Sequence, residues 1–117
     1  IHHLGDINKD HVVAAKATLV ALRPMGKSTP EIRSFETPSS TDQAPQLSNY
    51  SFSPNLYISI GKYWDLKKES LKLYNKELGV FPHPRSIKSI KALSIKRGAQ
   101  CGFKMAEAFY IIRKVEE

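Results

Sequence analysis

The first long pattern in the chain is a segment, residues 9–22, that is apolar on nearly every side of a helix. Its apolar positions are Val12, Val13, Ala15, Ala17, Leu19, Val20 and Leu22. Asn8 or Asp10 can cap this helix by accepting hydrogen bonds from the free N–H groups of its first turn. A helix with so few polar residues is usually covered on more than one side. We therefore expect a helix from about Lys9 to Leu22, sandwiched between other elements and ended by the Pro- and Gly-containing residues 23–30.

Three further segments alternate or cluster in ways typical of strands. "EIRSFE", residues 31–36, places Ile32 and Ser34 on one face and Arg33 and Phe35 on the other. "LYISI", residues 56–60, is rich in β-branched and aromatic residues. "IHH", residues 1–3, is typical of the end of a strand. A long polar loop, residues 37–55, separates the first two of these strands.

The second half of the chain predicts two helices and one ambiguous segment. The first helix, about Lys62 to Leu78, would turn Trp64, Leu71 and Tyr74 toward a core. The second begins at Pro84 or Ser86 and turns inward Ile87, Ile90 and Leu93. The pattern of "MAEAFYIIRKV", residues 105–115, fits a strand or a helix equally. This order of elements predicts a layered α/β protein, and the shortened first strand predicts the second half of such a domain.

Composition limits the class of protein. A chain of 117 residues fits one domain or part of one. It contains no apolar run long enough for a transmembrane helix and no signal peptide, so we expect no membrane partner. The single cysteine, Cys101, cannot form an internal disulfide and is typical of a reducing compartment, which indicates a cytoplasmic location.

The net charge of +7 raises the question of nucleic-acid binding. Most basic residues follow Lys62, interleaved with acidic ones, and no recognition motif accompanies them. This distribution is more typical of solvated helix faces than of a continuous basic stripe. We do not expect nucleic-acid binding, and keep a basic nucleic-acid module only as a third hypothesis.

The stretch "HHLGDINKDH", residues 2–11, gathers three histidines, two aspartates and one asparagine. Such a cluster can bind a metal, or it can be a polar loop that leads into a helix. Taken alone, His11 is more often a packed or capping residue than a ligand. Because neighbouring residues of a strand alternate, only one of His2 and His3 can face the same side as His11.

Three segments together resemble the carboxy-terminal half of the PIG-L/LmbE-like zinc N-deacetylases. They are "GDINKDHVVAA", "FETPSSTD" and "YNKELGVFPHPRSIKSIKALSIKRGAQCGFKMAEAF", in this order and covering nearly the whole chain. The resemblance implies the second half of a Rossmann-like α/β fold, with a mostly parallel sheet flanked by helices. It also implies a zinc-dependent hydrolase that removes the acetyl group from an N-acetylglucosamine-type conjugate.

The resemblance assigns roles to six residues. His11, in the family's later Asp-His motif, would be a zinc ligand. Asp10 would orient a neighbouring polar group or, equally, be a carboxylate in the first turn of the helix, where the helix dipole favours it. His83, between two prolines, would stabilise the oxyanion or protonate the leaving amine. Asp6 would support the loop or contact substrate. Asn8, which stands where many relatives have a histidine, would contact substrate, and Ser40 would contact substrate or simply lie in a solvent-exposed loop.

The family's early "HPDDE" motif, which supplies two further ligands and the general base, does not occur in this sequence. We therefore expect residues 1–117 to be the carboxy-terminal part of a single domain whose metal-motif half is absent, and the fragment alone to be inactive. Its expected partners are an amino-sugar substrate, the missing amino-terminal half and, in some assemblies, a second copy of the chain. The alternative is a non-catalytic binding or structural domain without a metal site.

Overall fold

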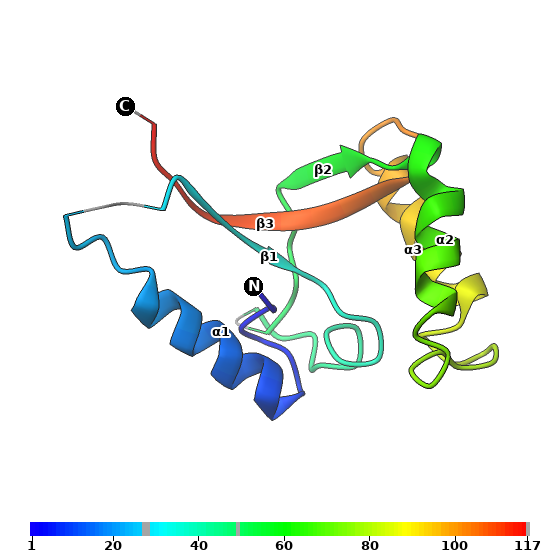
Figure 1. The fold of residues 1–117 in the computed structure, drawn as a ribbon, viewed down its shortest axis with the longest axis horizontal. Coiled ribbons are helices and arrows are strands. Elements are labelled where there is room, and N and C mark those ends of the chain that lie inside the picture. Colours follow the sequence, from blue (N-terminus) through cyan, green and yellow to red (C-terminus); the bar gives the residue numbers. More distant parts are fainter. Residues whose placement is uncertain (27–28, 49, 117) are drawn as a thin grey trace. The chain divides into compact units, whose positions relative to one another are not determined.

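The computed structural model describes residues 1–26, 29–48 and 50–116. Its elements, in chain order, are α1 (Lys9–Ala21), β1 (Glu31–Phe35), β2 (Leu56–Ser59), the 3₁₀-helix η1 (Gly61–Tyr63), α2 (Trp64–Lys72), α3 (Ile87–Ala99) and β3 (Ala106–Lys114) (Figure 1). The chain forms two compact units. The first unit comprises residues 1–56 and 109–117, and the second unit comprises residues 57–108.

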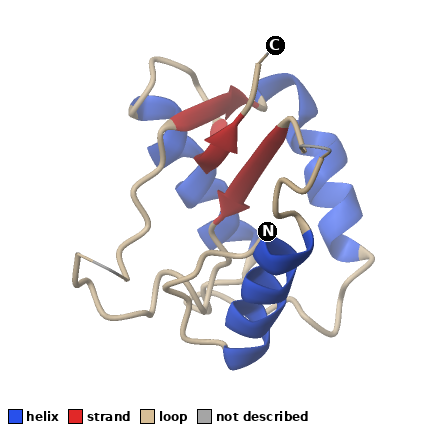
Figure 2. Cartoon of the chain, turned by 90° about the vertical axis from the view of Figure 1, so that its left-hand side faces the viewer, coloured by secondary structure: helices blue, strands red, loops and turns tan. Residues whose placement is uncertain are grey.

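The three strands form one antiparallel sheet in the order β1-β3-β2 (Figure 2). Strand β1 pairs antiparallel with β3, Glu31 opposite Lys114 and Phe35 opposite Phe109, with an irregularity between Ile32 and Arg33. The expectation of a mostly parallel Rossmann-like sheet is therefore wrong. The physical reason lies in residues 105–115, whose pattern did not distinguish strand from helix. They form the longest strand, at the centre of the sheet and opposite in direction to its neighbour β1.

One parallel contact is present in the described residues. His2 forms an isolated parallel bridge with Phe35, and the Phe35 N–H donates to the carbonyl of Ile1 at 3.0 Å. The predicted strand end at residues 1–3 is thus a single bridge at the edge of β1. The prediction for β1 itself is confirmed, because Ile32 and Ser34 are buried while Arg33 and Phe35 are exposed.

Helix α1 begins as the sequence predicts but is not covered on both sides. The Asn8 side chain accepts a hydrogen bond from the N–H of Asp10 at 2.9 Å and caps the helix. Only Ala15 of this helix is buried, whereas Val13 and Val20 remain 65% and 59% exposed. Within the described residues, therefore, one face of α1 is packed and the opposite apolar face is open. Residues 27–28 of the predicted break after this helix lie outside the described part of the chain.

The second unit has its core where η1 and α2 meet α3. Ile60, Trp64, Ile90 and Met105 form this core, with Leu71, Leu78 and Ile87 packed against it. The predicted helix 62–78 is wrong in its length, since α2 ends at Lys72. Leu73 and Tyr74, the first two residues after Lys72, are 83% and 66% exposed. Their side chains therefore do not pack against the core and do not favour a longer helix.

Helix α3 begins at its predicted cap. The Ser86 side chain accepts a hydrogen bond from the Ser89 N–H at 3.1 Å. Gly98 lies within this helix, where the chain passes close by: a Cβ there would meet the Phe103 carbonyl oxygen at 2.5 Å. Gly102, with φ of +80°, then reverses the chain toward β3. No helix in residues 1–26, 29–48 and 50–116 has the length and apolar character needed to cross a membrane.

Candidate functional site

The Asp6 carboxylate is the centre of the polar cluster near the start of the chain. Its side chain is fully buried. Oδ1 accepts a hydrogen bond from the Asn8 N–H at 2.8 Å, and Oδ2 accepts one from the Thr41 hydroxyl at 3.0 Å. The same Oδ2 lies 3.1 Å from Nδ1 of His11. With three donors around it and no exposed surface, Asp6 is placed to hold other groups and not to meet a substrate.

His11 lies in the first turn of α1, where the Asn8 cap and the Asp6 carboxylate fix it. Because an ionised carboxylate has no proton to give, Nδ1 of His11 donates and Nε2 of the neutral ring carries a lone pair. Nε2 makes no hydrogen bond to any residue that the structure describes. The side chain is 20% exposed. Nε2 is therefore the atom of this cluster that can accept a proton or bind a cation.

His2 covers one face of the His11 ring. The two ring centroids are 3.8 Å apart and the rings are almost parallel, at 6°. Burial lowers the pKa of His2 from its usual value, and repulsion by His11 lowers it further, against the opposing effect of Asp6. His2 therefore favours its neutral form, and the face of its ring packs against the ring of His11.

His3 points elsewhere, as strand alternation predicts. Its Nε2 lies 2.8 Å from the carbonyl oxygen of Tyr50, and its ring meets Phe52 edge-on. Gly5 allows this arrangement, since a Cβ there would lie 2.5 Å from the same Tyr50 oxygen and 2.8 Å from Nε2 of His3. Asn49, next to this contact, lies outside the described residues.

The loop that follows β1 contributes Thr41 to the hydrogen bonds around Asp6. The Thr37 N–H donates to the Thr41 hydroxyl at 2.8 Å, and Ser39 takes a left-handed backbone conformation with φ of 72°. Ser40 and Thr41 are both buried. In this arrangement the Ser40 hydroxyl is not at the surface where a sugar would reach it. The Thr41 hydroxyl instead supports Asp6.

Two of the other predicted residues have local structural partners. Asn8 uses its side-chain oxygen as the cap of α1. Asp10 is exposed in the first turn of that helix, where a carboxylate interacts favourably with the helix dipole. The carboxylate that orients His11 is thus Asp6 and not its neighbour Asp10.

His83 belongs to the second unit. The Arg85 N–H donates to its Nδ1 at 3.0 Å, so the neutral ring carries its proton on Nε2. The Gly79 backbone lies against this ring, and any side chain at that position would collide with it. The position of His83 is therefore fixed locally, with Nε2–H as an available donor.

The cluster does not by itself form a zinc site. Catalytic zinc is held by three protein ligands, usually His, Asp, Glu or Cys. The described residues contain no group of three such side chains placed to hold a metal ion. His11 can supply one nitrogen ligand, and a complete site would need donors from outside the part of the chain that the structure describes.

Sequence reasoning did not identify His2 and Thr41 as partners of the site. Thr41 is 35 residues from Asp6 in sequence, and no local pattern links them. The available signals are the alternation of His2 and His3 and the position of Thr41 next to Ser40 in the polar loop. Comparison of the chain with protein-family models, with curated proteins and with solved structures finds no match.

Proposed function

We propose that this chain is the carboxy-terminal part of a zinc-dependent hydrolase that removes the acetyl group from an N-acetylglucosamine-type conjugate. The resemblance of its three segments to the PIG-L/LmbE-like deacetylases supports the proposal. The observation that carries it is the Asp6–His11 pair, at 3.1 Å, with the Asp6 side chain fully buried.

This pair has the arrangement that a metal-ligating histidine needs. Such a histidine commonly donates its second ring N–H to a carboxylate, which fixes the tautomer and the ring orientation. Here Thr41 and the Asn8 N–H hold the carboxylate, and His2 packs against the ring. In the proposed enzyme, Asp6 takes the orienting role that the sequence suggested for Asp10, and Nε2 of His11 is the ligand atom.

Hydrolysis of the acetamide adds water across the C–N bond and yields acetate and a free amine, whose nitrogen must gain a proton as the bond breaks. Negative charge also develops on the carbonyl oxygen during the addition. His83, with its proton on Nε2, has a donor of the kind that this oxygen or the amine requires. Zinc, when bound, would supply Lewis-acid chemistry. Because His11 is one ligand of the several required, the proposal assigns the remaining ligands and the general base to other parts of the polypeptide.

Acetate release by the full-length polypeptide that contains this sequence tests the proposal. The substrates are N-acetylglucosamine conjugates, and the variants are His11→Ala and, as a matched control, His3→Ala. We expect a loss of at least about 100-fold in kcat/KM for His11→Ala, since even the outer-shell partners of metal ligands commonly cost 10–100-fold. His3→Ala should keep most of the activity. Full activity of His11→Ala would overturn the assignment of His11 as a ligand. No acetate release from any form of the protein, the wild type included, would favour the alternative of a non-catalytic domain.

A further inference from the structure

The net charge of the chain is confined to one of its two units. The second unit, residues 57–108, contains 11 Lys and Arg residues and 4 Asp and Glu residues, a net charge of +7. The first unit has 7 of each kind and is neutral in the same count. The distribution of charge is therefore strongly asymmetric, in keeping with the concentration of basic residues after Lys62 in the sequence.

Most acidic residues of the second unit are already paired. Glu69 forms an ion pair with Lys72, Glu77 with Arg85 and Glu107 with Lys67. The remaining positive charge of this unit lies on other residues. Helix α3, which contains no Asp or Glu, carries three exposed lysines. Lys88, Lys91 and Lys96 are all exposed, and none forms an ion pair with a described residue.

An apolar ridge runs along the outer side of α3, with Lys91 and Lys96 on its two sides and Lys88 in line with it at the start of the helix. Its inner side is fixed in the core through Ile90, Ser94 and Gly98. Residues spaced three or four apart share a face of a helix, so the outer side presents two lysine flanks and an apolar centre. We define the basic face of α3 as Lys88, Lys91, Ala92, Ile95, Lys96 and Ala99, all exposed, with Ile95 at 47%.

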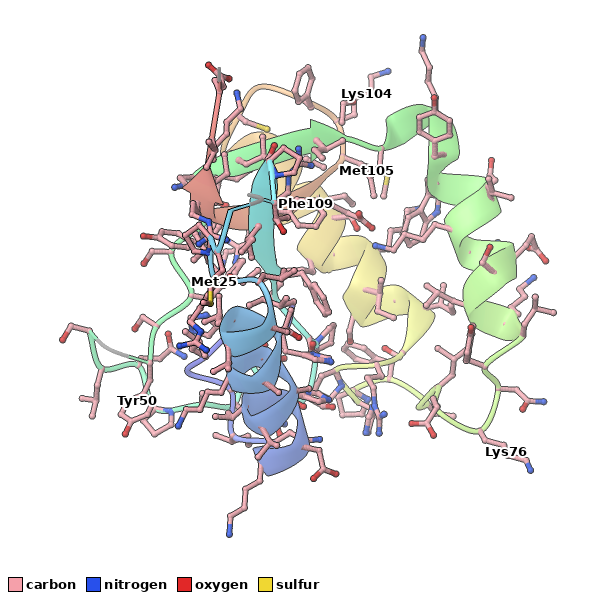
Figure 3. The ribbon with its side chains drawn as sticks, turned by 60° about the vertical axis from the view of Figure 1, so that its left-hand side comes forward. Met25, Tyr50, Lys76, Lys104, Met105 and Phe109 are labelled. Atoms are coloured by element: carbon pink, nitrogen blue, oxygen red, sulfur yellow. The ribbon has the colours of Figure 1, made fainter. Side chains whose placement is uncertain are left out.

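The environment of this face adds to both its charge and its apolar character. The Lys88 ammonium lies 4.1 Å from the centre of the Phe81 ring, which is itself 54% exposed. Lys104, in the loop between α3 and β3, extends away from the chain, whereas its neighbour Met105 is buried in the core (Figure 3). Because α3 is already a formed helix, the basic face needs no ordering when a partner binds.

We propose that the basic face of α3 binds the surface of an anionic phospholipid bilayer. An apolar ridge between lysines is typical of helices that lie in a membrane interface, where the lysine stems follow the apolar surface and the ammonium groups meet lipid phosphates. The phosphates of a nucleic acid would also attract the lysines, but a nucleic acid has no apolar phase into which the Ile95 side chain could insert. This proposal is independent of the proposed enzymatic function and revises the expectation of no membrane partner.

Co-sedimentation with lipid vesicles tests this assignment. The probes are vesicles of phosphatidylcholine with and without about one third phosphatidylserine, at about 0.1 M salt. The variants are Lys88→Gln/Lys91→Gln/Lys96→Gln on the face and, as a control with the same change in net charge, Lys9→Gln/Lys16→Gln/Arg23→Gln in the first unit. We expect binding to the anionic vesicles only, and a loss of roughly 100-fold in partitioning for the triple variant on α3. The control should change partitioning by less than about threefold.

A third variant distinguishes binding to a membrane from binding to a nucleic acid. Ile95→Ser keeps every charge, so it should weaken vesicle binding while leaving any binding to a single-stranded oligonucleotide unchanged. Equal losses for the two triple variants, equal binding to both kinds of vesicle, or oligonucleotide binding without vesicle binding would each overturn the proposal. Circular dichroism of each variant shows that it is folded before it is compared.

Discussion

Nδ1 of His11 lies 3.1 Å from the Oδ2 atom of Asp6, and the Asp6 side chain has no exposed surface. The pair joins a loop residue to the first turn of α1, five residues apart in sequence. A buried carboxylate is costly unless its hydrogen bonds are complete, and here the Asn8 N–H and the Thr41 hydroxyl complete them. The arrangement therefore links the stability of this part of the fold to the orientation of one imidazole.

Removal of the Asp6 carboxylate should destabilise the protein. Asp6→Ala leaves the His11 N–H, the Thr41 hydroxyl and the Asn8 N–H without their acceptor. We expect the free energy of unfolding to fall by about 2–4 kcal/mol, since each unpaired buried donor is costly. Urea unfolding measures the change. The matched control is Asp42→Ala, an exposed carboxylate in the loop after β1, which should stay within about 0.5 kcal/mol of wild type.

Thr41 should contribute to the same network. Thr41→Val keeps the shape of the side chain but removes one donor to Asp6 and the acceptor of the Thr37 N–H. A loss of about 1–2 kcal/mol is expected from urea unfolding. In the double variant with Asp6→Ala the two effects should be less than additive, because both remove the same hydrogen bond. Strict additivity would show that the two residues act separately.

Asn8 should be important as a helix cap. Asn8→Ala removes the acceptor for the Asp10 N–H and should cost about 1 kcal/mol, whereas Asn8→Asp should retain most of the stability. Helicity and the urea midpoint are the measurements. If Asn8→Ala were as stable as wild type while losing acetate release in the full-length polypeptide, its role would lie in substrate binding instead.

Gly98 and Gly61 offer a matched pair of substitutions in the second unit. A Cβ at Gly98 would meet the backbone N of Met105 at 2.7 Å and the Phe103 oxygen at 2.5 Å, whereas one at Gly61 would meet nothing within 4 Å. Gly98→Ala should therefore lower the free energy of unfolding by about 1–3 kcal/mol despite the better helix propensity of alanine. Gly61→Ala should be neutral or slightly stabilising. Equal effects at the two positions would show that the loop around Phe103 yields easily.

Local patterns in the sequence predicted the elements better than their arrangement. The cap of α1 by Asn8, the alternation along β1 and the start of α3 at Ser86 all depend on neighbours within a few residues, and all three are confirmed. The end of α2 at Lys72 was not predictable, since it depends on which side chains find a packed surface. The direction of β3 was equally inaccessible, because a strand pairs with residues far away in the chain.

The candidate site shows the same contrast between local patterns, which the sequence reveals, and contacts between distant residues, which it does not. The sequence identified Asp6 and His11, which lie close together along the chain, but assigned to Asp10 the orienting role that the structure gives to Asp6. Thr41 was visible only as one of several loop hydroxyls. Its contact with Asp6 spans 35 residues and follows from how the loop after β1 folds back. Local spacing can suggest which residues are chemically useful, but the partners that orient them depend on the tertiary fold.

The zinc content of the full-length polypeptide that contains this sequence tests the central claim most directly. Elemental analysis of the purified protein should give close to one zinc for each wild-type chain and for the His3→Ala control, and a clear deficit for His11→Ala. Asp6→Asn, which keeps the size of the side chain but removes its charge, should bind zinc more weakly, by roughly 10- to 100-fold. Unchanged zinc content in a folded His11→Ala variant, or no zinc in the wild-type protein, would contradict the assignment of His11 as a ligand.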